Sequence, residues 1–218
     1  MIKIENTEVY GFEAAIRGMR NPMNSWSRSD SNFKTIIRDN GKYVEDFIGD
    51  NDLKLMRQLA KSGPVHAKYR RMITVTCDIT APLYWWKEFD TYKVGTVRNS
   101  CSTMHKIADK AFTYDDFSTE HIGGVPNCDP LYCSAFETII EVLNEARHCY
   151  LDTRDKAYWW QMIQLLPSSY NQRATVQLNY EVLAGMYYWR KDHKLDEWHT
   201  FCEWIENWPY GKELICNA

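Results

Sequence analysis

The sequence predicts an α+β fold in which helices dominate the C-terminal half. Two observations support this class. Residues 68–79 are rich in β-branched side chains, as strands are, whereas the chain beyond residue 129 repeats apolar side chains at helical spacing. The 218 residues contain no internal repeat and no low-complexity linker, so we expect a single domain over residues 1–218.

The N-terminal quarter predicts a short strand at its start and one well-bounded helix. Asn21-Pro22 marks a turn between them. Asp50-Asn51-Asp52 can cap a helix that runs to about Ser62, where Gly63-Pro64 ends it. Residues 32–47 are ambiguous between helix and strand.

The middle of the chain predicts the best strand, a helix and an insertion. The strand over residues 68–79 leads to Ala81-Pro82, which we expect to start a helix, because proline is favoured at the first helical position. The polar stretch at about residues 106–128 contains Gly123-Gly124 and predicts a loop-rich insertion.

Four helices are expected after this insertion. Asp129-Pro130 opens the first, the second covers about residues 154–166, and the third runs over about residues 175–189. The fourth ends before Pro209 and carries one apolar stripe, formed by Leu195, Trp198, Cys202 and Ile205.

Composition excludes several classes of protein. A net charge of −3 argues against a general DNA-, RNA- or membrane-surface binder. The first residues lack the apolar stretch of a signal peptide, and no apolar run approaches the ~20 residues of a membrane helix, so we expect a cytoplasmic protein. The seven cysteines form no Cys-x-x-Cys pair, so we expect reduced, mostly buried thiols and propose no metal.

The third expected helix carries the most informative pattern. Asn179, Leu183, Met186 and Arg190 fall at positions i, i+4, i+7 and i+11, so the first and last point within about 20° of each other. An arginine on an apolar stripe needs a partner. Two interpretations remain open: a salt bridge to a carboxylate elsewhere, or an anion or nucleobase at the end of an internal pocket.

Two further segments are candidate phosphate sites. Arg173 is expected just before that helix, where backbone N–H donors favour a phosphate, although a solvated surface arginine would look the same. Residues 87–105 interleave hydroxyls and cations around a glycine, which suits a phosphate cradle or a plain polar loop. Cys101 and His105 could form a Cys–His pair, but spacing alone is poor support for one.

These pieces, in this order, resemble the flavin-dependent thymidylate synthase (ThyX) family. Family members carry Leu-Pro, then an Arg, an Asn six positions later, and another Arg eleven positions after that Asn. The corresponding residues here are Leu166-Pro167, Arg173, Asn179 and Arg190, with no gap. The residues that resemble the following His-x-x-Trp-Glu region, with one position deleted, are His193 and Glu197-Trp198.

Upstream segments extend the resemblance but depart from the family signature. Residues 62–66 resemble its Ser-Pro-x-x-His, and residues 79–82 resemble its Ile-Lys-Ala-Pro. The signature Arg-His-Arg-x-x-Ser-x-Asn-Glu-x-Ser-x-Arg-Tyr falls on residues 91–104, where only Lys93 for Arg and Thr96 for Ser are conservative replacements. The Arg-His-Arg that grips the flavin has become Thr-Tyr-Lys.

The resemblance implies a central antiparallel sheet, a homotetramer and a pocket for deoxyuridylate and FAD. It implies that Arg190 is catalytic by polarising the pyrimidine. The nucleotide-binding positions that it implies are Arg173, Arg190, Glu88, Lys93, Thr96, Asn99 and Cys101. The flavin-binding positions that it implies are His66, Lys93, Asn179 and His193. NADPH and methylenetetrahydrofolate would be the co-substrates of an active enzyme.

Three hypotheses about function follow. The first is a divergent ThyX-like flavoenzyme that methylates or otherwise modifies deoxyuridylate. The second is a catalytically inactive protein that sequesters nucleotides, such as a viral sponge for nucleotide immune signals in a phage-infected bacterium. The third is a structural oligomer without a ligand. Each charged hydrogen bond lost at the flavin diphosphate would weaken flavin binding by about 1.5–3 kcal/mol. This loss counts against the first hypothesis.

Overall fold

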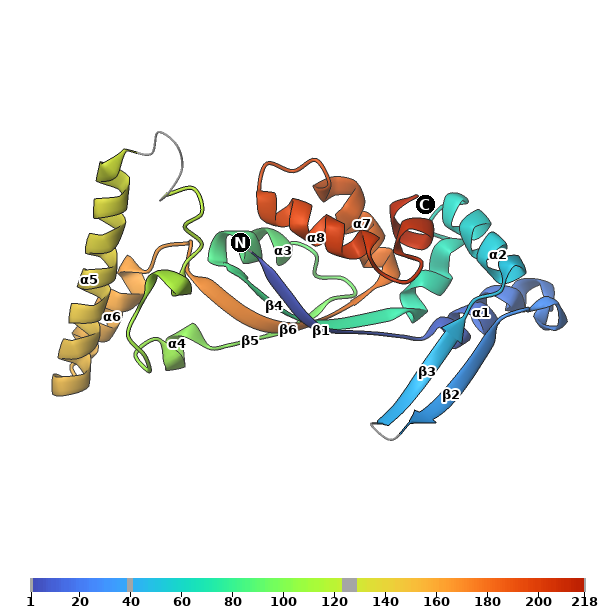
Figure 1. Ribbon diagram of the computed structural model, residues 1–218, viewed down its shortest axis with the longest axis horizontal. Coiled ribbons are helices and arrows are strands. Elements are labelled where there is room, and N and C mark those ends of the chain that lie inside the picture. The colour runs from blue at the N-terminus through green and yellow to red at the C-terminus, as the bar shows by residue number, and fades with distance from the viewer. Residues whose placement is uncertain (1, 39–40, 123–128, 218) are drawn as a thin grey trace. The chain divides into compact units, whose positions relative to one another are not determined.

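The computed structural model describes residues 2–38, 41–122 and 129–217. A four-stranded antiparallel sheet has the order β1-β4-β6-β5 (Figure 1). Its strands are β1 (Lys3–Tyr10), β4 (Thr74–Pro82), β5 (Val97–Ser100) and β6 (Asn171–Asn179). A separate antiparallel hairpin pairs β2 (Asn32–Arg38) with β3 (Gly41–Phe47), in the segment that the sequence left ambiguous. The α+β class with a helical C-terminal half is confirmed.

The chain forms two compact units. Unit 1 comprises Met1–Glu5, Asp78–Thr91 and Arg98–Thr175. Unit 2 comprises Asn6–Cys77, Tyr92–Val97 and Val176–Ala218.

Unit 1 is built around paired helices. Its helical elements are α3 (Leu83–Phe89), α4 (Thr103–Lys106), η4 (Tyr114–Asp116), α5 (Pro130–Thr153) and α6 (Lys156–Leu165). Helices α5 and α6 pack alongside each other (Figure 1). The side chain of Asp129 accepts a hydrogen bond from the N–H of Leu131 at 2.9 Å and so caps α5, as predicted.

The described part of the expected insertion contributes to the core of unit 1. It holds no strand and only one short helical turn, η4, before residue 122. Nevertheless Ile107, Phe112 and Phe117 are buried and pack in one cluster with residues of α5 and α6. Residues 123–128, which include Gly123-Gly124 and Cys128, lie outside the described residues.

Unit 2 packs short helices around large apolar side chains. Its helices are α1 (Phe12–Arg20), η1 (Asn21–Met23), η2 (Trp26–Arg28), α2 (Asp50–Lys61), η3 (Ala67–Met72), α7 (Tyr180–Arg190), α8 (Asp196–Glu206) and η5 (Lys212–Cys216). The fully buried residues of α7 and α8 include Tyr180, Leu183, Met186, Trp198, Phe201 and Ile205. Helices α2 and α8 lie close to where the sequence predicts them.

Two expected boundaries are wrong. The helix expected over residues 175–189 begins only at Tyr180, because residues 171–179 form strand β6. Alternate side chains of this strand are buried, namely Ala174, Val176 and Leu178, which is the period of a strand. Residues 67–72 form η3 rather than strand, so β4 begins only at Thr74. The helix expected from Ala81-Pro82 is α3, and Pro82 is both its N-cap and the last residue of β4.

The described cysteines are all free thiols, and most are less buried than expected. Cys77 and Cys202 are buried, whereas Cys101 is exposed and the other three are intermediate. Within the described residues, no helix combines the length and the apolar character that a membrane span requires.

Candidate functional site

Arg190 is held between two aromatic rings at the end of α7. Its Nε donates a hydrogen bond to the hydroxyl of Tyr92 at 2.8 Å. Its guanidinium carbon lies 4.8 Å from the ring centroid of Trp198 and 5.4 Å from that of Tyr92. The ring of His193 meets Trp198 edge-on, with 6.3 Å between centroids. These four residues form what we call the Arg190 cluster, in which the guanidinium makes cation–π contacts with Tyr92 and Trp198 at the C-terminus of α7.

The segment that carries Tyr92 forms a tight turn that packs against the start of α7. The hydroxyl of Thr96 donates to the carbonyl of Tyr92. Gly95 has φ +78°, and a Cβ there would lie 2.8 Å from Nδ2 of Asn179 and 2.9 Å from Cγ2 of Val182. Asn179 in turn caps α7 by accepting a hydrogen bond from the N–H of Val182 at 3.0 Å. The structure therefore brings the turn and Asn179 together, because glycine permits both the dihedral angle and the close approach.

Asn179 and Arg190 do not share one face of a helix, contrary to the prediction. Asn179 is the residue before the first turn of α7, with the extended dihedrals φ −132° and ψ 165°. Lys93, in the same turn as Tyr92, is exposed.

Arg173 lies on strand β6 and not at a helix start. In unit 1 its Nη2 lies 2.8 Å from Oδ2 of Asp78, and its Nη1 lies 3.9 Å from a carboxylate oxygen of Glu5. Thr175 donates to the other oxygen of Asp78 at 2.5 Å. The hydrogen bond to Asp78 and the charge of that carboxylate raise the pKa of Arg173. A phosphate at Arg173 would therefore compete with Asp78 and would lack the helix N–H groups that the sequence suggested.

The part of the signature segment in unit 1 also contains Arg98, whose terminal nitrogens have polar partners. Nη1 of Arg98 lies 2.8 and 2.6 Å from the two oxygens of Asp90, and the guanidinium carbon lies 4.0 Å from the ring centroid of Trp86. The N–H of Cys101 donates to the carbonyl of Arg173 at 2.8 Å, so these two predicted residues are neighbours. Asn99 is exposed on β5.

Glu88 lies in α3, close to the end of that helix. Its carbonyl oxygen accepts a hydrogen bond from the hydroxyl of Thr91 at 2.7 Å. Its side chain is partly exposed.

Unit 2 also contains a cavity of about 1320 Å³ with a cationic lining. The basic side chains that line it are Arg20, Arg28, Lys54, His66 and Lys68. The acidic side chain in the lining is Asp30, whose two oxygens accept the N–H groups of Asn51 at 2.9 Å and Asp52 at 3.1 Å. This carboxylate is engaged in capping α2, so the cavity favours an anionic ligand.

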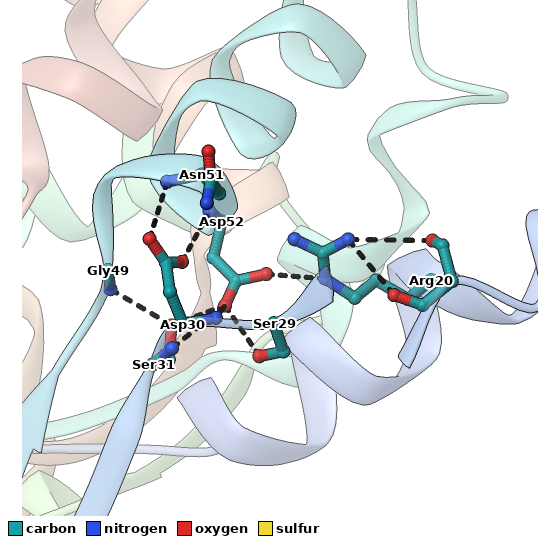
Figure 2. A network of polar contacts seen from close by, with 8 residues as sticks. Arg20, Ser29, Asp30, Ser31, Gly49, Asn51 and Asp52 are labelled. Carbon is teal, nitrogen blue, oxygen red and sulfur yellow. Dashed lines mark hydrogen bonds and ion pairs between the residues drawn. The ribbon is translucent and has the colours of Figure 1, made fainter. Parts of the chain in front are cut away.

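A buried network fixes one wall of this cavity (Figure 2). Asp52 is fully buried, and its Oδ1 accepts from Nε of Arg20 at 2.6 Å. Its Oδ2 accepts from the hydroxyls of Ser29 and Ser31, each at 2.6 Å, and from the N–H groups of Asp30 and Ser31. Burial alone would raise the pKa of Asp52, but the hydrogen bonds from Ser29, Ser31 and Arg20 outweigh it and lower that pKa.

Arg20 has a donor left over after this network is satisfied. Its Nη1 donates to the carbonyl of Ser25 at 3.2 Å, whereas Figure 2 shows no bond to its other terminal nitrogen. Arg20 is 4% exposed and lines the cavity. Such a donor fits a phosphate or carboxylate oxygen. Among the described residues, no group of three or more His, Cys, Asp or Glu side chains could hold a metal ion.

Solved structures with this fold are known. No protein-family model matches the chain, and no curated protein matches it by sequence. The structure matches that of the flavin-dependent thymidylate synthase ThyX from Helicobacter pylori, complexed with FAD and dUMP, with a TM-score of 0.69 and 12% identity over 98% of this chain and 97% of that one. The chain has a ThyX-like fold.

A second solved structure is also similar in fold. The UMP/dUMP methylase PolB from Streptomyces cacaoi, bound with 5-Br UMP, matches with a TM-score of 0.62 and 14% identity over 94% of this chain and 88% of that one. The ThyX-like fold therefore includes the first 50 residues and the region of the insertion, where the sequence resemblance carried little information.

The sequence did not single out several residues that the ThyX-like structure places at these sites. Tyr92 stood out only as the replacement of a family histidine, and Trp198 only as part of an apolar stripe and of the segment that resembles the family's His-x-x-Trp-Glu. Arg20 and Asp52 carry no local signal that would pair them, because they lie 32 positions apart on different helices. The basic residues around His66 are similarly scattered along the chain.

Proposed function

We propose that this ThyX-like chain binds a uridylate-type pyrimidine nucleotide, with Arg190 as the residue that polarises the base. The observation that carries the proposal is the position of the Arg190 guanidinium between the rings of Tyr92 and Trp198. A guanidinium has donors and no acceptor, so it suits a ring carbonyl, and partial burial strengthens its interaction with developing negative charge. The solved relatives with this fold hold dUMP or a UMP analogue.

Arg173 is proposed as the phosphate-binding residue. Its side chain is 49% exposed, and its present partner Asp78 offers carboxylate oxygens in the place that phosphate oxygens would take. The remaining nucleotide-binding candidates are Glu88, Lys93, Thr96, Asn99 and Cys101. Their roles stay predictions from the resemblance.

The cationic cavity of unit 2 fits a flavin cofactor better than the signature segment does. Its volume of about 1320 Å³ and its surplus of basic side chains suit a dinucleotide diphosphate. His66 and Arg20 would hold FAD there, while Lys93, Asn179 and His193 stay flavin candidates by resemblance alone. FAD, when bound, would supply the hydride transfer between NADPH and the one-carbon unit of methylenetetrahydrofolate.

Two measurements test the proposal. Calorimetry with UMP and dUMP should show saturable binding to the parent chain, and the substitution Arg190→Leu should abolish it. Lys191→Leu is the matched control, because Lys191 is the exposed neighbour of Arg190 and should bind as the parent does. Absence of binding by the parent, or equal affinity in Arg190→Leu, would reject the proposal.

A second candidate function is nucleotide sequestration without turnover. The observation that favours it is the contact of Tyr92 with Arg190, since Tyr92 stands where the family signature has a flavin-gripping histidine. Incubation with FAD, NADPH, methylenetetrahydrofolate and dUMP, followed by chromatography, separates the two candidates. Recovery of unchanged dUMP supports sequestration, and a methylated product supports the enzyme.

We also propose that the chain assembles as a homotetramer. Tyr188 and Trp189 are 67% and 71% exposed on α7, and large exposed aromatic side chains are typical of subunit interfaces. Light scattering of the purified chain should give about four times the monomer mass. A monomer would contradict the proposal.

A further inference from the structure

A smaller pocket of unit 2 adjoins the cationic cavity. Its volume is about 560 Å³, and the residues that it shares with the cavity are Arg20, Asn21 and Ser29. The lining that belongs to the smaller pocket alone includes three large apolar side chains, those of Ile16, Trp26 and Phe33. We call it the Trp26 pocket. The two hollows therefore meet at Arg20, where a cationic lining gives way to an aromatic one.

The indole ring of Trp26 is a fixed wall of this pocket. Its Nε1 donates a hydrogen bond to Oδ1 of Asn21 at 2.8 Å, which sets the orientation of the ring. The backbone of η2 is held as well, because the N–H of Ser29 donates to the carbonyl of Trp26 at 3.0 Å. Trp26 is nevertheless 50% exposed. A ring that is already oriented and still exposed can stack on a planar ligand with little loss of conformational freedom.

Arg20 supplies a polar group at the junction of the two hollows. Its side chain is 4% exposed, and its Nε and Nη1 are bonded to Asp52 and Ser25. Among the described residues, its Nη2 has no hydrogen-bond partner (Figure 2). A buried guanidinium donor with an open position fits an anionic oxygen. The further cations on the cavity side, which favour a phosphate there, are Arg28, Lys54 and Lys68.

The other charges that line the Trp26 pocket balance each other. Arg17 and Glu13 are an exposed i, i+4 pair, with 3.8 Å between Nη1 and Oε1. The hydroxyls of Ser29 and Ser31 already donate to Asp52. The Trp26 pocket therefore suits an uncharged planar ring, whereas the cationic cavity suits the phosphate.

We propose that the Trp26 pocket and the cationic cavity together form a purine nucleotide site, in which the base stacks on Trp26 and a phosphate binds Nη2 of Arg20. A bicyclic purine covers more of an indole ring than a pyrimidine does, and base–aromatic stacking contributes strongly to nucleotide binding. Two sources share this chemistry, a free nucleotide such as ADP and the adenine half of FAD. Only the FAD source rests on the proposed function, since the site includes neither Tyr92 nor Arg190.

Calorimetry with ADP tests the inference. The parent chain should bind ADP, and Trp26→Leu should lower the affinity by about tenfold or more, because the stacking surface is lost. Trp160→Leu is the matched control, since Trp160 of α6 is 46% exposed, and it should bind ADP as the parent does. The affinity for UMP should be the same in all three chains.

Truncated ligands give a measurement that needs no variant. Adenosine lacks the phosphate and ribose 5-phosphate lacks the base, so each should bind the parent chain at least about tenfold more weakly than ADP. If Trp26→Leu does not fold, as judged by circular dichroism, this comparison decides.

Competition separates the two sources of the nucleotide. Displacement of bound ADP by FAD but not by FMN assigns the site to the adenine half of the cofactor. If neither flavin displaces ADP, the ligand is a free purine nucleotide.

Several results would overturn the inference. These are absence of ADP binding by the parent chain, equal ADP affinity in Trp26→Leu, adenosine or ribose 5-phosphate that binds as tightly as ADP, or displacement of ADP by FMN and FAD alike. None of them involves the uridylate site, so UMP binding tests the proposed function separately. A parent chain that binds ADP but neither UMP nor dUMP would reject the proposed function and leave this inference intact.

Discussion

Nε of Arg20 lies 2.6 Å from Oδ1 of Asp52, and both side chains are buried. Arg20 ends α1 and Asp52 lies in the first turn of α2, while Ser29 and Ser31 bind the second carboxylate oxygen from the segment before β2. One carboxylate thus joins three parts of unit 2. Its removal would leave a buried arginine without its counter-charge.

The substitution Asp52→Asn should lower the free energy of unfolding by about 3–5 kcal/mol, because breaking a buried pair leaves one charge uncompensated. Urea unfolding monitored by tryptophan fluorescence measures the change. The matched control is Asp50→Asn, at an exposed position in the same turn of α2, which should change stability by at most about 0.5 kcal/mol. Equal effects of the two substitutions would contradict the role assigned to the network.

The same carboxylate predicts a pH dependence. Burial acts to raise the pKa of Asp52, but the hydrogen bonds dominate and lower it in the folded chain. The stabilisation is therefore complete above the unfolded pKa of about 3.9 and is lost as the pH falls through the lower folded value. Urea titrations from about pH 6 to about pH 3 should show a steeper loss of stability for the parent than for Asp52→Asn. Parallel profiles would refute this.

Two glycines of unit 2 should respond to alanine in opposite directions. Gly95→Ala should destabilise the chain by about 1–3 kcal/mol, because φ is +78° and the new Cβ would meet Asn179 and Val182. Gly185 lies inside α7, and a Cβ added there would meet no described atom within 4 Å, so Gly185→Ala should stabilise by about 0.5–1 kcal/mol. Thermal melting of both variants checks the prediction, and a change of the same sign in both would count against it.

Arg98→Lys should destabilise unit 1 by about 1–2 kcal/mol, although the charge is kept. Lysine cannot reproduce the planar stack on Trp86 or the set of bonds to Asp90 and Gln172. Thermal melting measures the effect, with Arg71→Lys at an exposed position as the control. If both substitutions change the melting temperature equally, the contacts of the Arg98 guanidinium do not stabilise unit 1 more than a lysine would.

Asp78→Asn should raise the affinity for UMP, because it removes the carboxylate that competes with phosphate for Arg173. We expect a gain of about three- to tenfold, in line with the strength of charge-assisted hydrogen bonds. Calorimetry measures it, and Asp109→Asn, which alters an exposed ion pair of unit 1, is the control. A weaker UMP affinity in Asp78→Asn would place the phosphate elsewhere.

The sequence predicted the helices that are delimited by strong local signals. Asp129 caps α5 as expected, and the stripe containing Trp198 and Ile205 forms α8. The prediction failed at β6, where Asn179 and Arg190 suggested one helical face. Residues 171–179 alternate in burial and pair in the sheet, as a strand does, whereas the prediction followed the helical spacing of Asn179 and Arg190.

The sequence named candidate site residues but could not predict the contacts that these residues make. The spacing of Arg173, Asn179 and Arg190 indicated a resemblance to the ThyX family, and that resemblance named the candidate positions. The partners came from elsewhere in the chain: Asp78 for Arg173 and Tyr92 for Arg190. Such pairings depend on tertiary contacts over more than 90 positions, which no local pattern encodes.

The ligand of the cationic cavity can be identified by its effect on thermal stability. A compound that binds the folded chain but not the unfolded chain stabilises it by mass action, by about 2.7 kcal/mol at one hundred times its dissociation constant. The buried Asp52 network forms one wall of the cavity. Binding of a ligand in the cavity should therefore raise the melting temperature of the chain. A thermal-shift screen of phosphorylated metabolites could therefore identify the ligand without an assay for any reaction.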